Sequence, residues 1–250
     1  MNMLSVLFFS FSSLFACGDK DDGDDSGVPG ECSPSEIACE DALFTDLSLQ
    51  DDEVSEGEVF TMTEGVDFVT GVDATAGGYN SASQNPWVYV RFTESGAEKV
   101  EIDDSAALED MSWDLALRRY IVRVNGGASG PGCVGALPLR EQVYADITAL
   151  PDGLQDSDFQ SDDFYTEDCT LIEDTSGLEG SPNVILGQWW TYPGCVATSY
   201  VPFLLRTSEG RTIKMVIEQY YEEGQEDCND GITTGLGESA IYKIRWQMLD

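Results

Sequence analysis

The stretch Ile241–Leu249, IYKIRWQML, indicates most clearly which kind of fold this chain adopts. Large apolar and aromatic residues occupy the even positions from 242 to 248, and charged or amide side chains occupy the odd positions between them. A period of two is typical of a β-strand that is buried on one face only. The stretch therefore predicts a half-buried strand.

Similar short runs precede this strand, and Gly, Asp, Asn and Pro separate them. Few stretches are long and periodic enough for a helix. Ser208–Gly210 predicts a hairpin turn with a positive φ at Gly210. Residues 150–182 are rich in Asp, Ser and Gly and predict long loops, one of them held by Cys169. The other predicted strands are Trp87–Thr93, Trp113–Val124, Asn183–Tyr192, Tyr200–Arg206 and Thr212–Tyr221.

The run Trp113–Val124, WDLALRRYIVRV, changes its parity halfway. Trp113, Leu115 and Leu117 share one face, whereas Tyr120, Val122 and Val124 have the opposite parity. A β-bulge near Arg118–Arg119 would bring both halves to the same face of one strand. The sequence therefore predicts an all-β fold of two packed, mostly antiparallel sheets with long loops.

The N-terminal residues predict export and lipidation. An unbroken run of apolar and small residues from Met3 to Ala16 is too short to span a bilayer and is typical of a signal peptide. Leu14–Cys17, LFAC, has the order that lipoprotein signal peptidase cleaves before a lipidated cysteine. The alternative is a buried apolar strand with a core cysteine, but the acidic sequence CGDKDDGDDSG that follows argues against burial.

We therefore expect a signal peptide at 1–16, an acidic flexible tether with lipidated Cys17 at 17–35, and a β domain at 36–250. Two acyl chains anchor a protein firmly to a membrane. Gly18, rather than Asp, follows the cysteine, which favours the outer membrane of a Gram-negative bacterium. The aspartates of the tether lack the spacing of a calcium-binding loop, so a solvated spacer is the favoured interpretation.

Charge and cysteine content narrow the function further. The formal net charge of −35 opposes binding to nucleic acid. Of the seven cysteines, six remain besides Cys17, and an even set in an exported chain predicts three disulfides. Fifteen connectivities are open, and Cys32 with Cys39 is the easiest local pair. The six are Cys32, Cys39, Cys133, Cys169, Cys195 and Cys228.

Three segments resemble the HmuY-like haem-binding lipoproteins of Gram-negative bacteria. They are Trp87–Phe92 (WVYVRF), Trp113–Gly127 (WDLALRRYIVRVNGG) followed by Gly130, and Leu205–Gly210 (LRTSEG) leading into Lys214 and Tyr220–Tyr221. With the C-terminal strand, the resemblance covers most of residues 70–249. The added cysteines resemble a disulfide-bearing branch of that family in myxobacteria-like organisms.

The resemblance implies two packed β-sheets that take haem between loops and pass it to an outer-membrane receptor. Better-known members bind the iron with paired His and some relatives with Met, but this chain contains no histidine. The corresponding loops hold Tyr165 and Tyr192, and a Tyr phenolate can bind ferric haem iron. Buried tyrosines in loops are more often packing residues. Among the methionines, Met111 is the candidate to test, because Met215 and Met248 lie in predicted core strands; Met62 is the remaining candidate.

Four cations, Arg91, Arg118, Arg119 and Arg123, lie within 33 residues of a strongly acidic chain. Guanidinium groups suit carboxylates such as haem propionates, so Arg118, Arg119 and Arg123 are candidate ligand-binding residues. The favoured alternative is structural, with pairing to neighbours such as Asp114 and Glu101.

The sequence does not predict an enzyme. Without histidine, the common Ser-His-Asp and Cys-His arrangements are absent. No Gly-rich phosphate loop joins a strand to a helix. We expect a lipid-anchored envelope protein that binds haem or another flat apolar ligand. The alternative is an adhesion or interaction lipoprotein that has lost haem binding.

Overall fold

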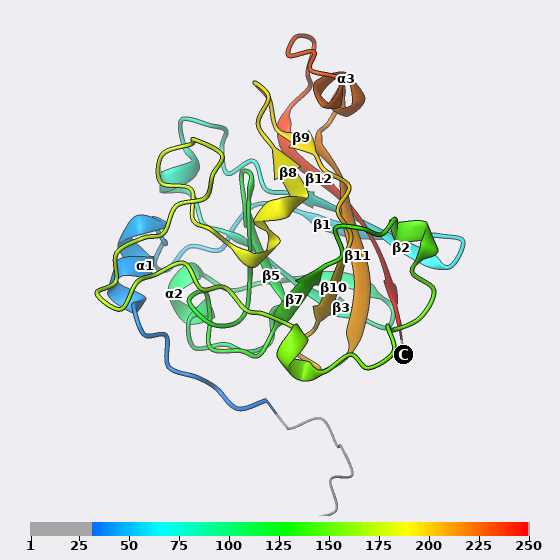
Figure 1. The fold of residues 1–250 in the computed structure, drawn as a ribbon. Helices are drawn as coiled ribbons and strands as arrows, with labels where there is room; N and C mark the ends of the chain where they lie inside the picture. Colours follow the sequence, from blue (N-terminus) through cyan, green and yellow to red (C-terminus); the bar gives the residue numbers. More distant parts are fainter. Residues whose placement is uncertain (1–31, 250) are drawn as a thin grey trace, which may run out of the picture. The chain divides into compact units, whose positions relative to one another are not determined.

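The computed structural model describes residues 32–249, which form two main antiparallel sheets (Figure 1). The predicted signal peptide, Cys17 and most of the predicted tether lie outside the described residues. The larger sheet has the order β1 (Val59–Glu64), β2 (Asp67–Asp73), β12 (Ser239–Met248), β11 (Thr212–Tyr221), β10 (Phe203–Arg206) and β7 (Gly135–Pro138). The smaller has the order β4 (Gly96–Val100), β3 (Val88–Thr93), β5 (Leu115–Arg118) and β6 (Ile121–Val124). The all-β prediction is confirmed.

Short elements complete the described part of the chain. A two-stranded ribbon pairs β8 (Trp190–Thr191) with β9 (Ala197–Thr198). Within residues 32–249 no helix is long and apolar enough to cross a membrane. The α-helices are α1 (Glu40–Asp46), α2 (Asp104–Ala107) and α3 (Gln225–Asn229), and the 3-10 helices are η1 (Ala82–Gln84), η2 (Tyr144–Asp146), η3 (Asp156–Asp158) and η4 (Ile185–Trp189).

The main core contains the inward-facing residues of both large sheets. In β12, Tyr242, Ile244 and Trp246 are buried and alternate with half-buried residues, as the sequence pattern predicts. Neighbouring β11 contributes Ile213, Met215 and Ile217 to the same core, and its residues at 214, 216 and 218 therefore lie on the outer face of the six-stranded sheet.

A second core covers the other face of the four-stranded sheet. Tyr89 of β3 and Ala116 of β5 pack there with Leu43 of α1 and with Trp113. The four-stranded sheet is thus buried on both faces, which explains why every residue of β5 is buried and no polar alternation marks it.

The run Trp113–Val124 is a hairpin rather than the bulged single strand predicted. β5 pairs with β6, placing Leu117 opposite Val122 and Leu115 opposite Val124. The change of parity in the sequence is therefore the turn between two strands. Arg119 adopts a left-handed conformation there with φ of 52°, and its backbone N–H donates to Ala74 O at 2.9 Å.

The prediction of a strand over Asn183–Tyr192 is also wrong in its main part. Residues Ile185–Trp189 form η4, and only Trp190–Thr191 pair as a strand. Gly187 N donates to Val184 O at 2.9 Å, a local bond that an extended strand would not make. The apolar run belongs to a buried 3-10 turn, a case that periodicity alone does not separate from a buried strand.

Of the resemblance residues, Asp114 links the two sheets and Asn125 fixes a neighbouring loop. The carboxylate of Asp114, which is fully buried, accepts from Phe92 N at 2.7 Å and from Ser208 N at 2.6 Å. It thereby joins β3 to the turn between β10 and β11. Burial raises the pKa of Asp114 to about 6. Asn125 donates to Trp113 O and accepts from Gly132 N, each at 3.0 Å, so it fixes the chain after β6.

Three disulfides are present, as predicted, but the local pair Cys32–Cys39 does not form. Cys32 bonds to Cys133 and Cys39 to Cys169, over sequence separations of 101 and 130 residues, and Cys195 bonds to Cys228. Cys39 precedes α1, which packs its Leu43 into the second core and holds Cys39 beside the loop that contains Cys169. Cys32 instead lies beside the turn after β6, where Ser35 N donates to Pro131 O at 2.9 Å.

Candidate functional site

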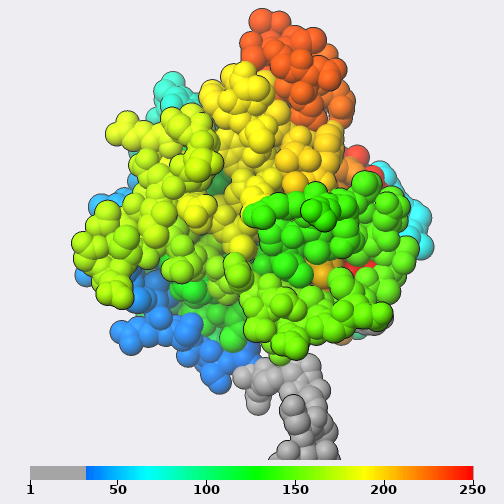
Figure 2. Space-filling model, in the orientation of Figure 1, coloured from blue at the N-terminus to red at the C-terminus, as the bar shows by residue number. Residues whose placement is uncertain are grey.

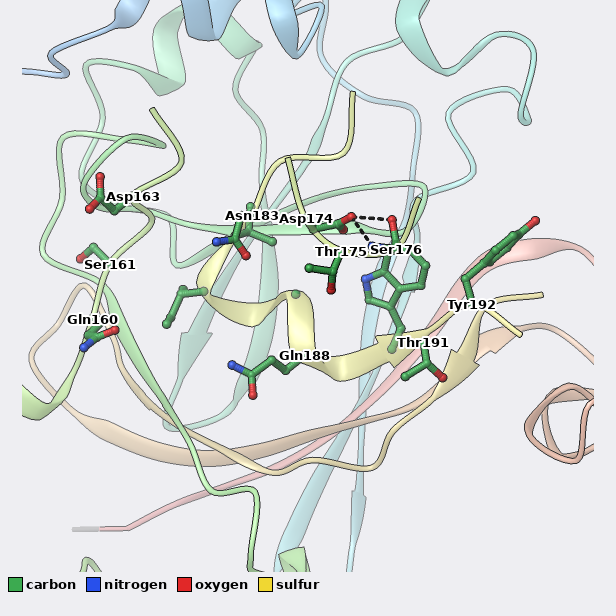
Figure 3. Close-up of a pocket in the computed structure, with 14 residues that line it drawn as sticks. Gln160, Ser161, Asp163, Asp174, Thr175, Ser176, Asn183, Gln188, Thr191 and Tyr192 are labelled. Atoms are coloured by element: carbon green, nitrogen blue, oxygen red, sulfur yellow. Dashed lines mark hydrogen bonds between the residues drawn. The ribbon is translucent and has the colours of Figure 1, made fainter. Parts of the chain in front are cut away.

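A cleft of about 550 Å³ opens between three loop segments. Figure 3 shows Gln160, Ser161 and Asp163 at one end of the cleft and Tyr192 at the other. Its volume is that of a site for a small organic ligand. The segments that line it are residues 160–163, 174–176 and 183–192, and the apolar part of the lining comes from Val184, Ile185, Trp190 and Tyr192.

Asp162 positions two of these segments. The carboxylate is buried, with 1% of the residue exposed, and accepts hydrogen bonds from Val124 N, Ile185 N and Ser129 Oγ at 3.0, 2.8 and 2.6 Å. The first donor belongs to β6 and the second begins η4. Because one carboxylate satisfies donors from three segments, η4 and its cleft residues are fixed relative to the four-stranded sheet.

The third segment is held by Asp174. Its carboxylate accepts from the backbone N–H of Ser176 at 2.9 Å and from Ser181 Oγ at 2.7 Å (Figure 3 shows the bonds to Ser176). Asp163, by contrast, is exposed. The lining therefore carries two carboxylates beside the amides of Asn183, Gln160 and Gln188, and it contains no Lys or Arg.

Of the two predicted tyrosine ligands, only Tyr192 lines this cleft. Its side chain is 45% exposed, and its ring meets the buried ring of Trp190 edge-on, with centroids 6.3 Å apart. No hydrogen bond to its hydroxyl forms within residues 32–249. Figure 3 shows this hydroxyl pointing away from the other labelled side chains. The phenol is thus free to take a partner.

Tyr165 lies elsewhere and is engaged. It borders an adjoining cavity near Cys39, which shares Gln160, Ser161 and Asp163 with the cleft, and its hydroxyl donates to Asp46 Oδ2 at 3.1 Å. Burial and the neighbouring Asp46 raise the pKa of Tyr165, so its phenolate form is disfavoured.

None of the four candidate methionines, all of them within residues 32–249, lines the cleft. Met111 is half-buried in the turn between α2 and β5, Met215 is fully buried in the main core, and Met62 is exposed on β1. Met248 packs against the main core.

The predicted arginines bind protein groups rather than line the cleft. Arg118 donates to the carbonyls of Ser48, Asn85 and Leu47. Arg119 donates to Ser239 O at 3.0 Å. Their partners are mainly backbone carbonyls, not the carboxylates of Asp114 or Glu101; Glu101 instead pairs with Lys99 at 2.9 Å.

Arg123 belongs to β6, and its fully buried side chain lies on the second-core face of the four-stranded sheet. Its guanidinium carbon lies 4.2 Å from the ring centroid of Trp87, and that of Arg118 lies 4.6 Å from the same centroid. It also donates to Ser129 O at 3.2 Å. Such contacts hold the second core together and leave no guanidinium edge at the cleft.

Sequence reasoning missed the cation at the cleft rim, Arg140. This exposed residue donates from Nε to Gln188 Oε1, and Gln188 lines the cleft. No signal in the sequence marks the pair, because 48 positions separate the two residues. Among the described residues, no group of three or more Cys, Asp or Glu side chains is placed to hold a metal ion.

Comparison with known protein families gives one match. A family model described as HmuY protein matches residues 83–232, which include the signature runs from Trp87 and Trp113. No curated protein matches the chain.

Solved structures that are similar to this chain include a proposed lipoprotein from Bacteroides fragilis, with 17% identity, a TM-score of 0.44 and coverage of 74% of this chain and 93% of that one. A proposed HmuY-like haem-binding protein from Bacteroides vulgatus has 17% identity, a TM-score of 0.43 and coverage of 76% and 97%. The apo HmuY analog from Tannerella forsythia has 15% identity, a TM-score of 0.39 and coverage of 80% and 100%.

Proposed function

The chain belongs to the HmuY family, and from that membership we propose that it is a non-enzymatic, lipid-anchored envelope protein that binds haem in the cleft beside Trp190. The observation that carries the proposal is the phenol of Tyr192, which lines the cleft without a hydrogen-bond partner among the described residues. Tyr phenolate is an established protein ligand of ferric haem iron.

The cleft fits a tetrapyrrole in three respects. Trp190 and Tyr192 offer an aromatic wall, and haem is flat and largely apolar. Tyr192 offers an iron ligand. Arg140 at the rim offers a guanidinium for a propionate, which the lining itself lacks. The carboxylates of Asp163 and Asp174 would repel propionates, so we place these groups toward Arg140 and solvent.

A haemin titration tests the proposal. The protein would be the chain from Gly18 onward, exported so that its disulfides form. We expect a Soret shift that saturates at one haemin per chain, with quenching of tryptophan fluorescence because Trp190 lies in the wall. Tyr192→Phe should weaken binding at least about tenfold and change the spectrum, since it removes the only iron ligand we assign.

Tyr165→Phe is the matched control, because that hydroxyl already bonds to Asp46; with Met111→Ala, it should leave the titration unchanged. Saturable binding that Tyr192→Phe does not alter would show that the iron ligand is wrongly assigned. A titration that never saturates would refute haem binding. The interaction-lipoprotein alternative would then be favoured by the polar amides and carboxylates of the lining.

Lipid anchoring at Cys17 is a separate part of the proposal and rests on the sequence LFAC and the apolar run before it. We place the anchor in the outer membrane, the tether at 17–35 and the binding domain at 36–250. Intact mass spectrometry of the full chain purified from membranes should show a mature N-terminus at Cys17 carrying acyl chains. A Cys17→Ala chain should lack that mass, and an unmodified Cys17 in the parent protein would contradict the anchor.

A further inference from the structure

A second cavity, of about 680 Å³, lies on the outer face of the six-stranded sheet. It is open to solvent and lies between β11, β12 and the loop that contains η2, which crosses over them (Figure 1). In Figure 2 this loop, in green, covers the strands so that only small parts of them show in orange and red. The cavity shares no lining residue with the Trp190 cleft.

The walls of this cavity are mainly apolar. Val216 of β11 and Tyr144 of η2 face it from the sheet and the loop. Three further lining residues, Val66, Val143 and Tyr200, are 76%, 63% and 41% exposed. Large apolar side chains that gather around one cavity while remaining exposed are typical of a ligand site.

Lys214 places a positive charge in this apolar setting. The residue is 5% exposed, and its Nζ donates to Ile147 O at 2.7 Å and to Tyr144 O at 3.3 Å. It also lies 4.2 Å from the ring centroid of Tyr144. No carboxylate pairs with it within residues 32–249. A buried ammonium group without a counter-ion is costly, and an ammonium has three protons to donate.

The acids of the cavity are already paired at its other side. Glu218 Oε1 lies 2.6 Å from Arg245 Nε, and Asp67 Oδ2 lies 3.5 Å from Arg245 Nη1. The Tyr144 hydroxyl donates to Asp67 Oδ1 at 2.9 Å. These acids are therefore engaged, and Lys214 is the lining cation without an acidic partner.

We propose that this cavity binds an amphipathic carboxylate, with the head on Lys214 Nζ and an alkyl or aryl body against Val66, Val143, Tyr200 and Val216. The bound carboxylate would supply the counter-ion that Lys214 lacks. This inference does not depend on haem binding, because the two sites use different residues.

Decanoate is the probe, titrated calorimetrically into the chain from Gly18 onward. Salt of about 0.15 M reduces the Debye length to ~8 Å and so screens the acidic surface. We expect one decanoate per chain, and 1-decanol, which has the same body without the charge, should bind at least about tenfold more weakly. Decyltrimethylammonium should not bind.

Lys214→Met should reduce decanoate affinity at least about tenfold and leave decanol affinity unchanged. Lys243→Met is the matched control, because Lys243 lies on the same sheet face but pairs with Glu218 and does not line the cavity. If Lys214→Met fails to fold, Ala145→Trp serves instead. Ala145 is an exposed lining residue, and the larger side chain should fill the cavity and block both ligands.

Equal affinities for decanoate and decanol would overturn the proposal, as would the absence of saturable binding. Loss of decanoate binding in the Lys243→Met protein would also overturn it. Haemin titration should give the same result for the Lys214→Met and parent proteins, so failure at one site is distinguishable from failure at the other.

Discussion

Asp162→Asn is expected to lower the free energy of unfolding by about 3 kcal/mol, because it disrupts a buried acceptor shared by three segments. An asparagine offers one acceptor oxygen, and its NH₂ group would face a donor. At least one of Val124 N, Ile185 N and Ser129 Oγ would then remain unsatisfied. Guanidinium chloride unfolding followed by circular dichroism measures the loss.

The same variant should change how stability depends on pH. Burial raises the pKa of Asp162 to about 6, above the value of about 4 expected in the unfolded chain. The unfolded state therefore releases this proton first as pH rises. The contribution of Asp162 to stability is full below about pH 4 and is lost as pH rises to about 6. Asp162→Asn lacks this titrating group. The difference in free energy of unfolding between the parent protein and the variant should therefore narrow as pH rises from about 4 to about 6.

Asp163→Asn is the matched control, because the neighbouring carboxylate is exposed. It should change the free energy of unfolding by less than about 0.5 kcal/mol. A loss in Asp162→Asn no larger than that of the control would contradict the role assigned to Asp162. So would a stability difference that stays constant between pH 4 and pH 6.

The sequence predicts strands best where one face is polar. In Ile241–Leu249 the alternation is visible because the outer face of β12 carries Lys243, Arg245 and Gln247. The hairpin of β5 and β6 was misjudged because both faces of its sheet are buried, so no polar alternation separates the strands, and the turn at Arg119–Tyr120 contains no Gly, Pro, Asn or Asp. Arg119 occupies the left-handed turn position that normally favours Gly.

The first two strands of the large sheet were not predicted at all. β1 and β2 are rich in Thr, Asp and Glu, and β1 exposes Phe60 and Met62 to solvent. β1 pairs with β2 at the edge of the sheet, and β2 in turn pairs with β12, a neighbour more than 160 positions away. Such pairing leaves no local pattern.

The sequence suggested candidate ligand-binding residues from their side-chain chemistry, but it did not predict which of them line the cleft. Tyr192 was identified because phenolate can bind iron, and the structure places it in a cleft. Tyr165 carries the same phenol, and Arg123 carries a guanidinium suited to a propionate, but their functional groups bind Asp46 and Ser129. Tertiary neighbours decide which polar side chain keeps a free functional group. Those neighbours are distant in sequence, so no local sequence pattern predicts them.

Removal of the Cys39–Cys169 disulfide, by Cys39→Ser with Cys169→Ser, is expected to cost about 4 to 5 kcal/mol of stability. The bond closes a separation of 130 residues, for which the chain-entropy estimate is about 5 kcal/mol. The overlapping Cys32–Cys133 disulfide shortens the closed loop and lowers the estimate to about 4 kcal/mol. The folded variant gains little flexibility when this bond is absent, because Leu43 and Leu47 still hold α1 in the second core. Almost the whole entropy gain therefore falls to the unfolded state and lowers stability.

The Cys32–Cys133 disulfide provides the control. Its separation of 101 residues gives nearly the same closure entropy. Its native anchor, however, is the exposed segment 33–36, which is held mainly by the bond from Ser35 to Pro131. Without the disulfide this segment can fray in the folded protein, and the entropy regained there offsets part of the loss. We therefore expect Cys32→Ser with Cys133→Ser to cost clearly less.

Guanidinium chloride unfolding under non-oxidising, non-reducing conditions compares the two double variants with the parent protein. Equal costs would mean that closure entropy alone determines the effect and that the core contacts of α1 add nothing. A larger cost for the Cys32–Cys133 pair would contradict the argument. The expected order follows from where each bond is attached in the folded state: Cys39 joins a loop to a helix packed into a core, whereas Cys32 joins a surface turn to an exposed end of the domain.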